Sequence, residues 1–193
     1  MRCFVAIDLP DDLKDTLALA QGALGDAAPQ ADVRWTPPGS MHVTLQFLGE
    51  VPAAEVPAVA GAVAGAASRC PPLALRAVGV GAFPSPARAR VVFADVEGDA
   101  DALRALVGDL GARLEPLGWP PEARAFHAHV TLGRVRRPRS LGRLATAIAD
   151  VGRRARFGAW TATDVVLYHS RLGGRHGSTY EALARVPLSS PCP

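Results

Sequence analysis

The chain has 193 residues, of which 49% are hydrophobic, and its formal net charge is +3. This balance excludes an intrinsically disordered chain, because such chains combine low hydrophobicity with high net charge. Three widely spaced cysteines argue against a disulfide framework and against a zinc knuckle. The longest apolar run, residues 56–67, falls short of the ~20 residues that a membrane span needs, and the start is too weakly apolar for a signal peptide. We therefore expect a soluble cytoplasmic protein.

The first half of the chain alternates strands and helices. Residues 2–9 form a β-rich run that ends at Pro10, and residues 11–24 space their leucines at helical intervals. Residues 33–40 give a strand end followed by a Pro/Gly loop. Residues 41–51 alternate apolar and polar side chains as a strand does, and a helix is expected between residues 52 and 68.

The second half continues in the same way. Strands are predicted at 73–83, 88–96, 125–135, 161–172 and 178–188, and helices at 99–118 and 140–153. The complete order is β-α-β-α-β-β-α-β-α-β-β. Most of the arginines lie in this half, which favours an anionic partner, although a solvated surface would explain them equally well.

The four residues HVTL occur twice, at 42–45 and at 129–132. The shift of 87 positions between them also brings residues 4–9 onto 91–96 and residues 76–83 onto 163–170. One constant shift over three segments predicts a duplicated β-α-β-α-β unit. We expect one domain over residues 1–193, with halves of about 1–87 and 88–193. Its fold class would be α+β, with two pseudo-symmetric lobes, mainly antiparallel sheets around a central cleft, and helices outside.

Each HVTL places a histidine and a threonine on the same face of a strand, because side chains two positions apart point the same way. Packing the halves about a two-fold axis would bring the two pairs to one small site. Imidazole exchanges protons near neutral pH, so two of them can serve as acid and base on opposite sides of one reaction centre. The threonine hydroxyls can donate hydrogen bonds to oxygens without adding charge. A phosphate between the lobes would use all four groups.

With these motifs the chain resembles the two-histidine (2H) phosphoesterase superfamily, which is named for paired His-x-Thr-x motifs. It is most similar to the bacterial RNA 2′,3′-cyclic phosphodiesterase family, also called 2′-5′ RNA ligases. The likeness extends over nearly the whole chain. It is carried by RCFVAIDLP, RWTPPGSMHVTLQFLGEV, GAFPSPARARVVFADV, FHAHVTLGRV and SRLGGRHGSTYEAL.

The resemblance implies that water opens a terminal 2′,3′-cyclic phosphate to a 2′-phosphate, with 2′-5′ ligation as the reverse reaction. His42 would be the proton donor to the departing 3′ oxygen and His129 the acceptor of the proton from water. Thr44 and Thr131 would bind the non-bridging oxygens, without metal or cofactor. The two motifs are identical, so the assignment of donor and acceptor comes from the family alone.

Arg134 lies where the family often has a basic residue. It is five positions past His129, so on an ideal strand it would face away from the site, and only a bulge, twist or strand end would bring it to the phosphate. A surface role is the alternative. His127 raises a zinc alternative with His42 and His129, against which stand the missing carboxylate or cysteine ligands and the unused threonines.

The expected partner is RNA with a 2′,3′-cyclic phosphate end, including tRNA-derived ends, bound by a monomer. Two rival functions stay open: hydrolysis of a small cyclic phosphate metabolite, and an RNA-binding module whose histidines only contact phosphate. His169 and His176 have no counterpart in the other half and are interpreted as structural or surface residues. The aromatic residues that could either stack on bases or belong to the core are Phe4, Phe47, Phe126 and Tyr180.

Overall fold

The structure is a computed structural model that describes residues 1–137, 141–152, 154–171 and 179–189. The α-helices in this part of the chain are α1 (Asp11–Ala27), α2 (Val56–Ala67), α3 (Ala100–Leu114) and α4 (Gly142–Gly152). The strands are β1 (Arg2–Asp8), β2 (Asp32–Trp35), β3 (His42–Glu50), β4 (Leu73–Phe83), β5 (Val91–Gly98), β6 (His129–Arg137), β7 (Arg156–Ala162), β8 (Asp164–Arg171) and β9 (Thr179–Pro187).

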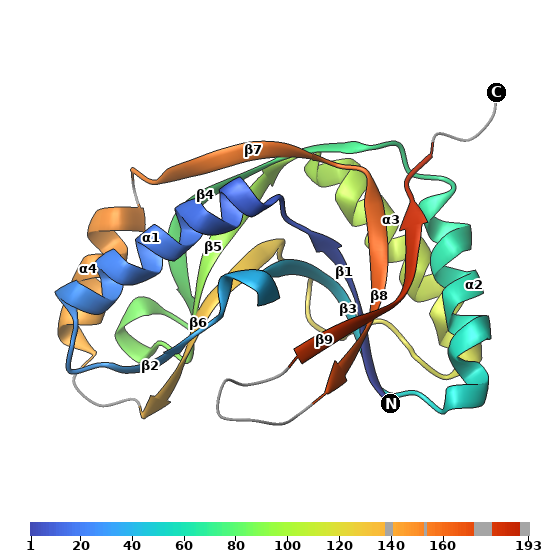
Figure 1. Cartoon of the computed structure of the whole chain (residues 1–193), viewed down its shortest axis with the longest axis horizontal. Coiled ribbons are helices and arrows are strands. Elements are labelled where there is room, and N and C mark those ends of the chain that lie inside the picture. The colour runs from blue at the N-terminus through green and yellow to red at the C-terminus, as the bar shows by residue number, and fades with distance from the viewer. Residues whose placement is uncertain (138–140, 153, 172–178, 190–193) are drawn as a thin grey trace.

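The nine strands form one antiparallel sheet with the order β7-β4-β5-β6-β3-β1-β8-β9, and β2 pairs with β6 outside this path. The sheet curls into a half-barrel (Figure 1). Strands β7, β4, β5 and β6 make one lobe, called the His129 lobe below. Strands β3, β1, β8 and β9 make the other, the His42 lobe. The α+β class, the antiparallel pairing and the two lobes confirm the fold predicted from the sequence.

Each lobe takes strands from both halves of the sequence. Strand β4 of the first half pairs with β5 of the second, and β8 of the second half pairs with β1 of the first. The helices are exchanged in the same way: α1 packs with α4 beside the His129 lobe, and α2 packs with α3 beside the His42 lobe (Figure 1). The lobes in space therefore differ from residues 1–87 and 88–193, and the two halves hold one another together.

Local sequence explains why the elements begin where they do. Helix α1 follows Pro10, and the acidic side chains of Asp11 and Asp12 stand in its first turn, where they stabilise the positive end of the helix dipole. Its apolar stripe, which includes Leu17 and Leu24, is fully buried. Helix α2 has a proline in its first turn, where no amide hydrogen is required. None of the described helices is both long and apolar enough to cross a bilayer.

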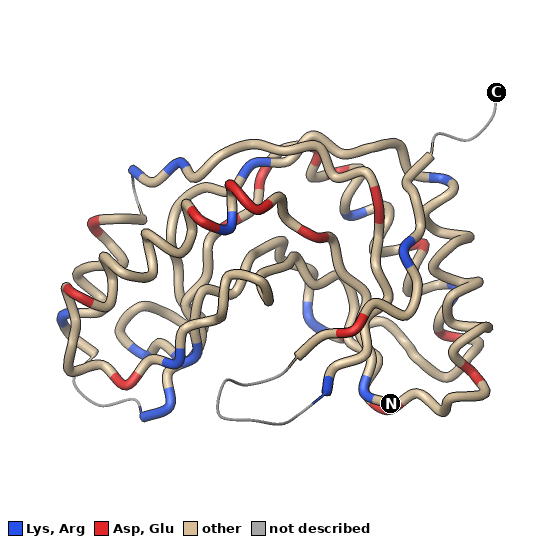
Figure 2. Tube along the Cα trace, viewed as in Figure 1, with Lys and Arg blue, Asp and Glu red and all other residues tan. Residues whose placement is uncertain are grey.

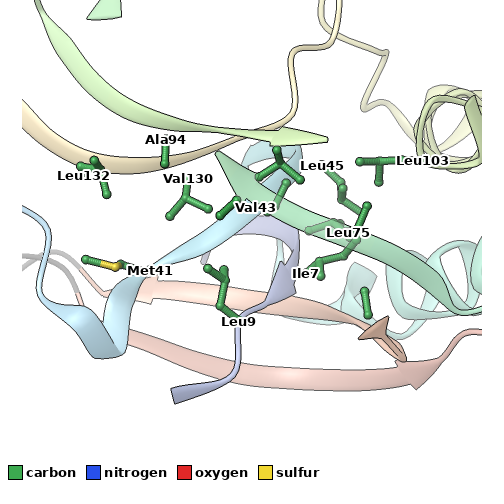
Figure 3. Close-up of a cluster of buried hydrophobic side chains, with 14 of the residues drawn as sticks. Ile7, Leu9, Met41, Val43, Leu45, Leu75, Ala94, Leu103, Val130 and Leu132 are labelled. Atoms are coloured by element: carbon green, nitrogen blue, oxygen red, sulfur yellow. The ribbon is translucent and has the colours of Figure 1, made fainter. Parts of the chain in front are cut away.

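The core lies beneath the two HVTL motifs. Val43 and Val130 are 0% exposed, and Leu45 and Leu132 are at most 5% exposed. Figure 3 shows these four side chains together with Ile7, Leu9, Met41 and Leu75 in one cluster. Burying such a side chain stabilises the fold by roughly 1.5–3 kcal/mol. The apolar half of each motif thus anchors the strand, and this fixes the position of the polar half.

The structure corrects some details of the sequence-based assignment. Strand β7 was not predicted, because the glycine and arginines around residues 154–158 interrupt the alternation of apolar and polar side chains that marks a strand. The strand expected over 125–135 begins only at His129, so His127 lies in the segment that precedes it. A short β2 was predicted only as a strand end; it pairs with the second half of β6.

Candidate active site

The two HVTL motifs lie beside each other at the centre of the sheet. Strands β3 and β6 are antiparallel, and Val43 is the partner of Val130. This register sets His42 across from Thr131, and Thr44 across from His129. All four side chains share the face opposite to the buried valines. The sequence-based expectation that two imidazole–hydroxyl pairs would come together is realised around an approximate two-fold axis through Val43 and Val130.

Each imidazole is oriented by a backbone carbonyl. The Nδ1 atom of His42 lies 2.9 Å from the carbonyl oxygen of Ser40, and that of His129 lies 2.7 Å from the carbonyl oxygen of His127. A carbonyl only accepts hydrogen bonds, so each Nδ1 carries the proton of the neutral ring. The Nε2 atom of each ring therefore keeps its lone pair, which is the state required of a general base.

Burial lowers the pKa of both imidazoles. The pKa of His42 falls from 6.5 to about 4, chiefly because burial penalises the charged ring, although the Ser40 carbonyl and the Asp8 carboxylate favour the charged form. The pKa of His129 is lowered for the same first reason, against the His127 carbonyl and Asp95. A charge on His129 lowers the pKa of His42 further, and the charge of Arg134 lowers the pKa of both rings. Both rings are therefore neutral at pH 7 as long as no anion is bound.

Neither threonine hydroxyl of the two motifs has a hydrogen-bond partner among the described residues. Both side chains are partly buried, and both lie beside an imidazole on the same face. A hydroxyl that is not engaged by the protein can donate its hydrogen to a ligand oxygen without first losing another bond. Thr44 and Thr131 are thus free to bind an oxyanion placed between the histidines.

A β-bulge brings Arg134 to the same face. Val92 pairs with Gly133 and Phe93 pairs with Thr131, so Leu132 is an extra residue that reverses the alternation of β6. Arg134 is consequently exposed on the histidine side, where its charge lowers the pKa of both rings. The bulge thus places Arg134 on the histidine side of β6, while its contact with a phosphate stays a prediction.

The first motif has the same bulge. Val5 pairs with Gln46 and Ala6 with Thr44, so Leu45 is the extra residue of β3, at the position that corresponds to Leu132. The burial patterns of β3 and β6 are identical along all nine positions. Phe47 is therefore the counterpart of Arg134, and its ring is 55% exposed. The two ends of the site differ in chemistry: one carries a phenyl ring and the other a guanidinium group.

Asp8 and its partners support His42. Asp8 pairs with His42 between β1 and β3. The Tyr168 hydroxyl donates to Asp8 Oδ1 at 2.6 Å, and Arg185 Nη2 donates to Asp8 Oδ2 at 2.6 Å. Burial and the bond to Asp8 raise the pKa of Tyr168, so the phenol stays protonated. Phe4 stacks on the imidazole, with ring centroids 4.8 Å apart. This network fixes both the ring and a negative charge close to it.

The surroundings of His129 repeat this plan with other residues. Asp95 pairs with His129 between β5 and β6, and its Oδ1 lies 2.7 Å from His127 Nε2. The phenyl rings of Phe83 and Phe93 stack on each other and meet the His129 ring edge-on, with centroid distances of 5.2 and 5.4 Å. His127 thus contributes its carbonyl to His129 and its imidazole to Asp95, which explains its place two residues before the motif.

Sequence reasoning missed several of these residues. Asp8 and Asp95 served only to mark the repeat, yet their shared shift of 87 positions was a signal that both copies need a carboxylate there. Tyr168 and Arg185 have no such signal, because nothing in the sequence shows that β8 and β9 lie beside β1. His169 is 3.7 Å from Glu181, away from the motifs, which fits a structural role. His176 lies outside the described residues, as do Arg139 and Arg153 of the second half of the chain.

The described part of the chain has no cluster of side chains that fits the zinc alternative. Within the described ranges, no three side chains of histidine, cysteine, aspartate or glutamate lie close enough together to hold a metal ion. The Nε2 atom of His127 lies 2.7 Å from Asp95 Oδ1, and the His127 and His129 rings meet edge-on with their centroids 5.9 Å apart. The described arrangement is suited to proton transfer at an anion, with two neutral imidazoles, two free hydroxyls and one guanidinium.

Comparison with known proteins agrees with this geometry. The family model described as LigT-like phosphoesterase matches residues 7–93 and 95–178, which include both HVTL motifs. The chain belongs to the LigT-like phosphoesterase family. The resemblance to the two-histidine superfamily that the motifs suggested is thereby confirmed, and the chain is an enzyme of the phosphoester hydrolase class by family.

Named relatives show how close the likeness is. A relative in Methanothermobacter thermautotrophicus, called RNA 2′,3′-cyclic phosphodiesterase, is 30% identical over 172 residues, covering 89% of this chain and 91% of its own. The crystal structure of TT0787 of Thermus thermophilus matches with a TM-score of 0.79 and 28% identity, covering 98% of this chain and 99% of that one. The crystal structure of E. coli LigT complexed with 3′-AMP matches with a TM-score of 0.76 and 25% identity, covering 98% of both chains.

Proposed function

We propose that this protein hydrolyses 2′,3′-cyclic phosphate ends of RNA to 2′-phosphate ends without a metal ion, by paired histidine acid–base catalysis. The observation that carries the proposal is the central register of β3 and β6, which sets two imidazole–hydroxyl pairs across from each other. The relative in Methanothermobacter thermautotrophicus carries the name of this activity. Each imidazole offers an Nε2 that can take or return one proton, as the reaction requires.

The proposed step is an in-line displacement at phosphorus. His129 accepts a proton from water as the water oxygen bonds to phosphorus. The bond between phosphorus and the 3′ oxygen breaks, and His42 donates a proton to that oxygen. The product keeps the phosphate on the 2′ oxygen, while His129 has gained one proton and His42 has lost one. The assignment of His42 as donor rests on the family resemblance, because the geometry of the two rings is nearly the same.

His42 must be protonated before it can donate, although burial holds its pKa at about 4 when no anion is bound. The bound cyclic phosphate should raise this pKa, because its negative charge beside the ring favours the charged imidazole. In this proposal, binding of the anionic substrate raises the pKa of His42, so that the ring is protonated and can act as the acid. Thr44, Thr131 and Arg134 bind the non-bridging oxygens and balance the charge that builds up in the transition state.

Ligation would be the same chemistry with a 5′-hydroxyl in place of water. That hydroxyl would lose its proton to His129 and bond to phosphorus, and the 3′ oxygen would leave with a proton from His42, which yields a 2′-5′ linkage. Hydrolysis should dominate, since water is abundant. We further propose that the enzyme acts as a monomer in the cytoplasm on RNA ends that include tRNA-derived ones. The arginines that gather where β2 and β6 run together would contact the RNA backbone (Figure 2).

The test is turnover of defined substrates in the presence of EDTA. An oligonucleotide with a 2′,3′-cyclic phosphate end should be converted to the 2′-phosphate, and mononucleotide 2′,3′-cyclic phosphates tested in parallel show whether a small metabolite is preferred. A protein that binds the oligonucleotide without turning it over would be an RNA-binding module, and the proposal would be wrong. A substrate with sulfur at the 3′ position needs no proton on its leaving group, so it should restore activity to His42→Ala and leave His129→Ala inactive.

A further inference from the structure

A buried glutamine lies at each of the two bulges of the site. Among the residues that the structure describes, Gln21 (7% exposed) and Gln46 (2% exposed) are the only buried side chains that carry an amide, a hydroxyl or a charge. A buried amide costs free energy unless it is hydrogen-bonded, so its bonding partners show what it stabilises. Gln46 follows the bulge residue Leu45 in β3, and Gln21 reaches the bulge residue Leu132 from α1.

The amide of Gln21 joins the bulge of β6 to the end of β2. Its Nε2 atom donates to the Leu132 carbonyl at 2.7 Å and to the Thr36 carbonyl at 2.8 Å. Thr36 follows β2 directly, and its backbone amide donates to the same Leu132 carbonyl at 2.8 Å. Both lone pairs of that carbonyl are thus engaged. Because a bulge leaves its extra residue without a partner on the neighbouring strand, here β5, these bonds hold Leu132 in place.

The position of Leu132 decides the direction of Arg134. As the extra residue of β6, Leu132 reverses the alternation, so Arg134 is exposed on the histidine side. In a regular strand Arg134 would face the opposite side, since it lies five residues past His129. A change that loosens the bulge should therefore turn the guanidinium away from the place proposed for the phosphate.

The bulge of the first motif is held in a different way. The shift of 87 positions brings Gln21 onto Gly108 of α3, which has no side chain to reach a strand. Gln46 bonds from β3 itself, and its Nε2 lies 3.2 and 3.3 Å from the carbonyl oxygens of residues 119 and 120. That bulge directs Phe47, which carries no charge. The two glutamines are alike in burial and bonding, but only Gln21 holds the bulge that directs a cation.

From this arrangement we infer that Gln21 is a positioning residue, which directs the Arg134 guanidinium towards the phosphate by holding the Leu132 bulge. The inference rests on the proposed function, in which Arg134 binds a non-bridging oxygen, and adds a residue of α1 to it. Both N–H groups of the Gln21 amide are engaged by backbone carbonyls, so the amide has no donor left for a ligand. Gln21 thus takes part in phosphate recognition without touching the phosphate.

The test is a double-mutant cycle with inorganic phosphate as the ligand. Gln21→Met keeps the length of the side chain and removes both donors. In titration calorimetry Arg134→Ala should weaken phosphate binding about 10-fold, as expected for a lost hydrogen bond to a charged group, and Gln21→Met should do the same. The double variant should bind no more weakly than Arg134→Ala, because a guanidinium that is absent cannot be misdirected. Losses that multiply to about 100-fold, or an unchanged affinity in Gln21→Met, would overturn the inference.

A second measurement needs neither ligand nor turnover. The charge of Arg134 lowers the pKa of both His42 and His129, so NMR titration of Gln21→Met should show both pKa values raised, as in Arg134→Ala. If Gln21→Met does not fold, Gln21→Asn takes its place, because a side chain one methylene shorter withdraws the amide from both carbonyls. Unchanged pKa values in the folded variant contradict the inference. A wild-type protein that hydrolyses no cyclic phosphate would refute the proposed function and leave this inference standing.

The matched control is Gln46→Met, which removes the same two donors beside the other bulge. Urea unfolding should show a loss of stability similar to that of Gln21→Met. Its effect on phosphate binding should add to that of Arg134→Ala, and it should not raise the pKa of either histidine. If Gln46→Met raises both pKa values as Gln21→Met does, a general loosening of the sheet explains the result, and Gln21 has no positioning role.

Discussion

The neutral state of His42 makes the stability of the fold depend on pH. In the unfolded chain this imidazole has a pKa of 6.5, and in the folded protein burial lowers the pKa to about 4. Below pH 6.5 the unfolded chain therefore binds a proton that the folded protein does not. The free energy of unfolding must fall as the pH drops from 6.5 towards 4, and above 6.5 the stabilisation is fully present.

The size of the effect follows from the two pKa values. Lowering the pH from 7.5 to 4.5 should cost about 2.5 kcal/mol of stability through this ring alone. The variant His42→Asn removes the titration and keeps an N–H that can donate to the Ser40 carbonyl. Urea unfolding of both proteins at the two pH values isolates the difference, since every other titrating group is shared.

The wild-type protein should lose about 2.5 kcal/mol more than His42→Asn over this interval. If the two proteins lose stability in parallel, the ring is not held neutral by burial, and the argument for a free Nε2 at neutral pH is wrong. A titration of the His42 ring by NMR gives the pKa directly. The same titration with saturating inorganic phosphate should move the pKa upward, because an anion beside the ring favours its charged form.

Four further outcomes are expected. His129→Asn should lower kcat by ~10²–10⁴-fold with an unchanged circular dichroism spectrum, because it removes one partner of the acid–base pair. Arg134→Ala should raise KM and shift the acid limb of the kcat/KM profile to higher pH, because the guanidinium charge lowers the pKa of both histidines. Asp8→Asn should shift that limb to lower pH, because the carboxylate raises the pKa of His42. Saturating EDTA should leave the rate unchanged; a rate that fell with chelator and recovered with added metal would contradict the metal-free mechanism.

The linear sequence was enough to predict both histidine–threonine pairs of the candidate site. A residue pattern of period two is enough to show that His42 and Thr44 share a face, and its repetition 87 positions later is enough to predict a second, equivalent strand. Periodicity also predicted the strands and helices with a regular pattern of apolar residues, including all four described α-helices. These features are local, so the order of residues determines them before any tertiary contact forms.

The tertiary structure determined the features of the site that depend on strand pairing. The bulges at Leu45 and Leu132 add one residue to each strand and turn Phe47 and Arg134 towards the site; a bulge is set by the partner strand and leaves no mark in the alternation. The supports of His42 come from β8 and β9, far along the chain from β1, because β8 joins the sheet beside β1. Sequence thus determined which groups face the same way on each strand, and long-range pairing decided which of them meet.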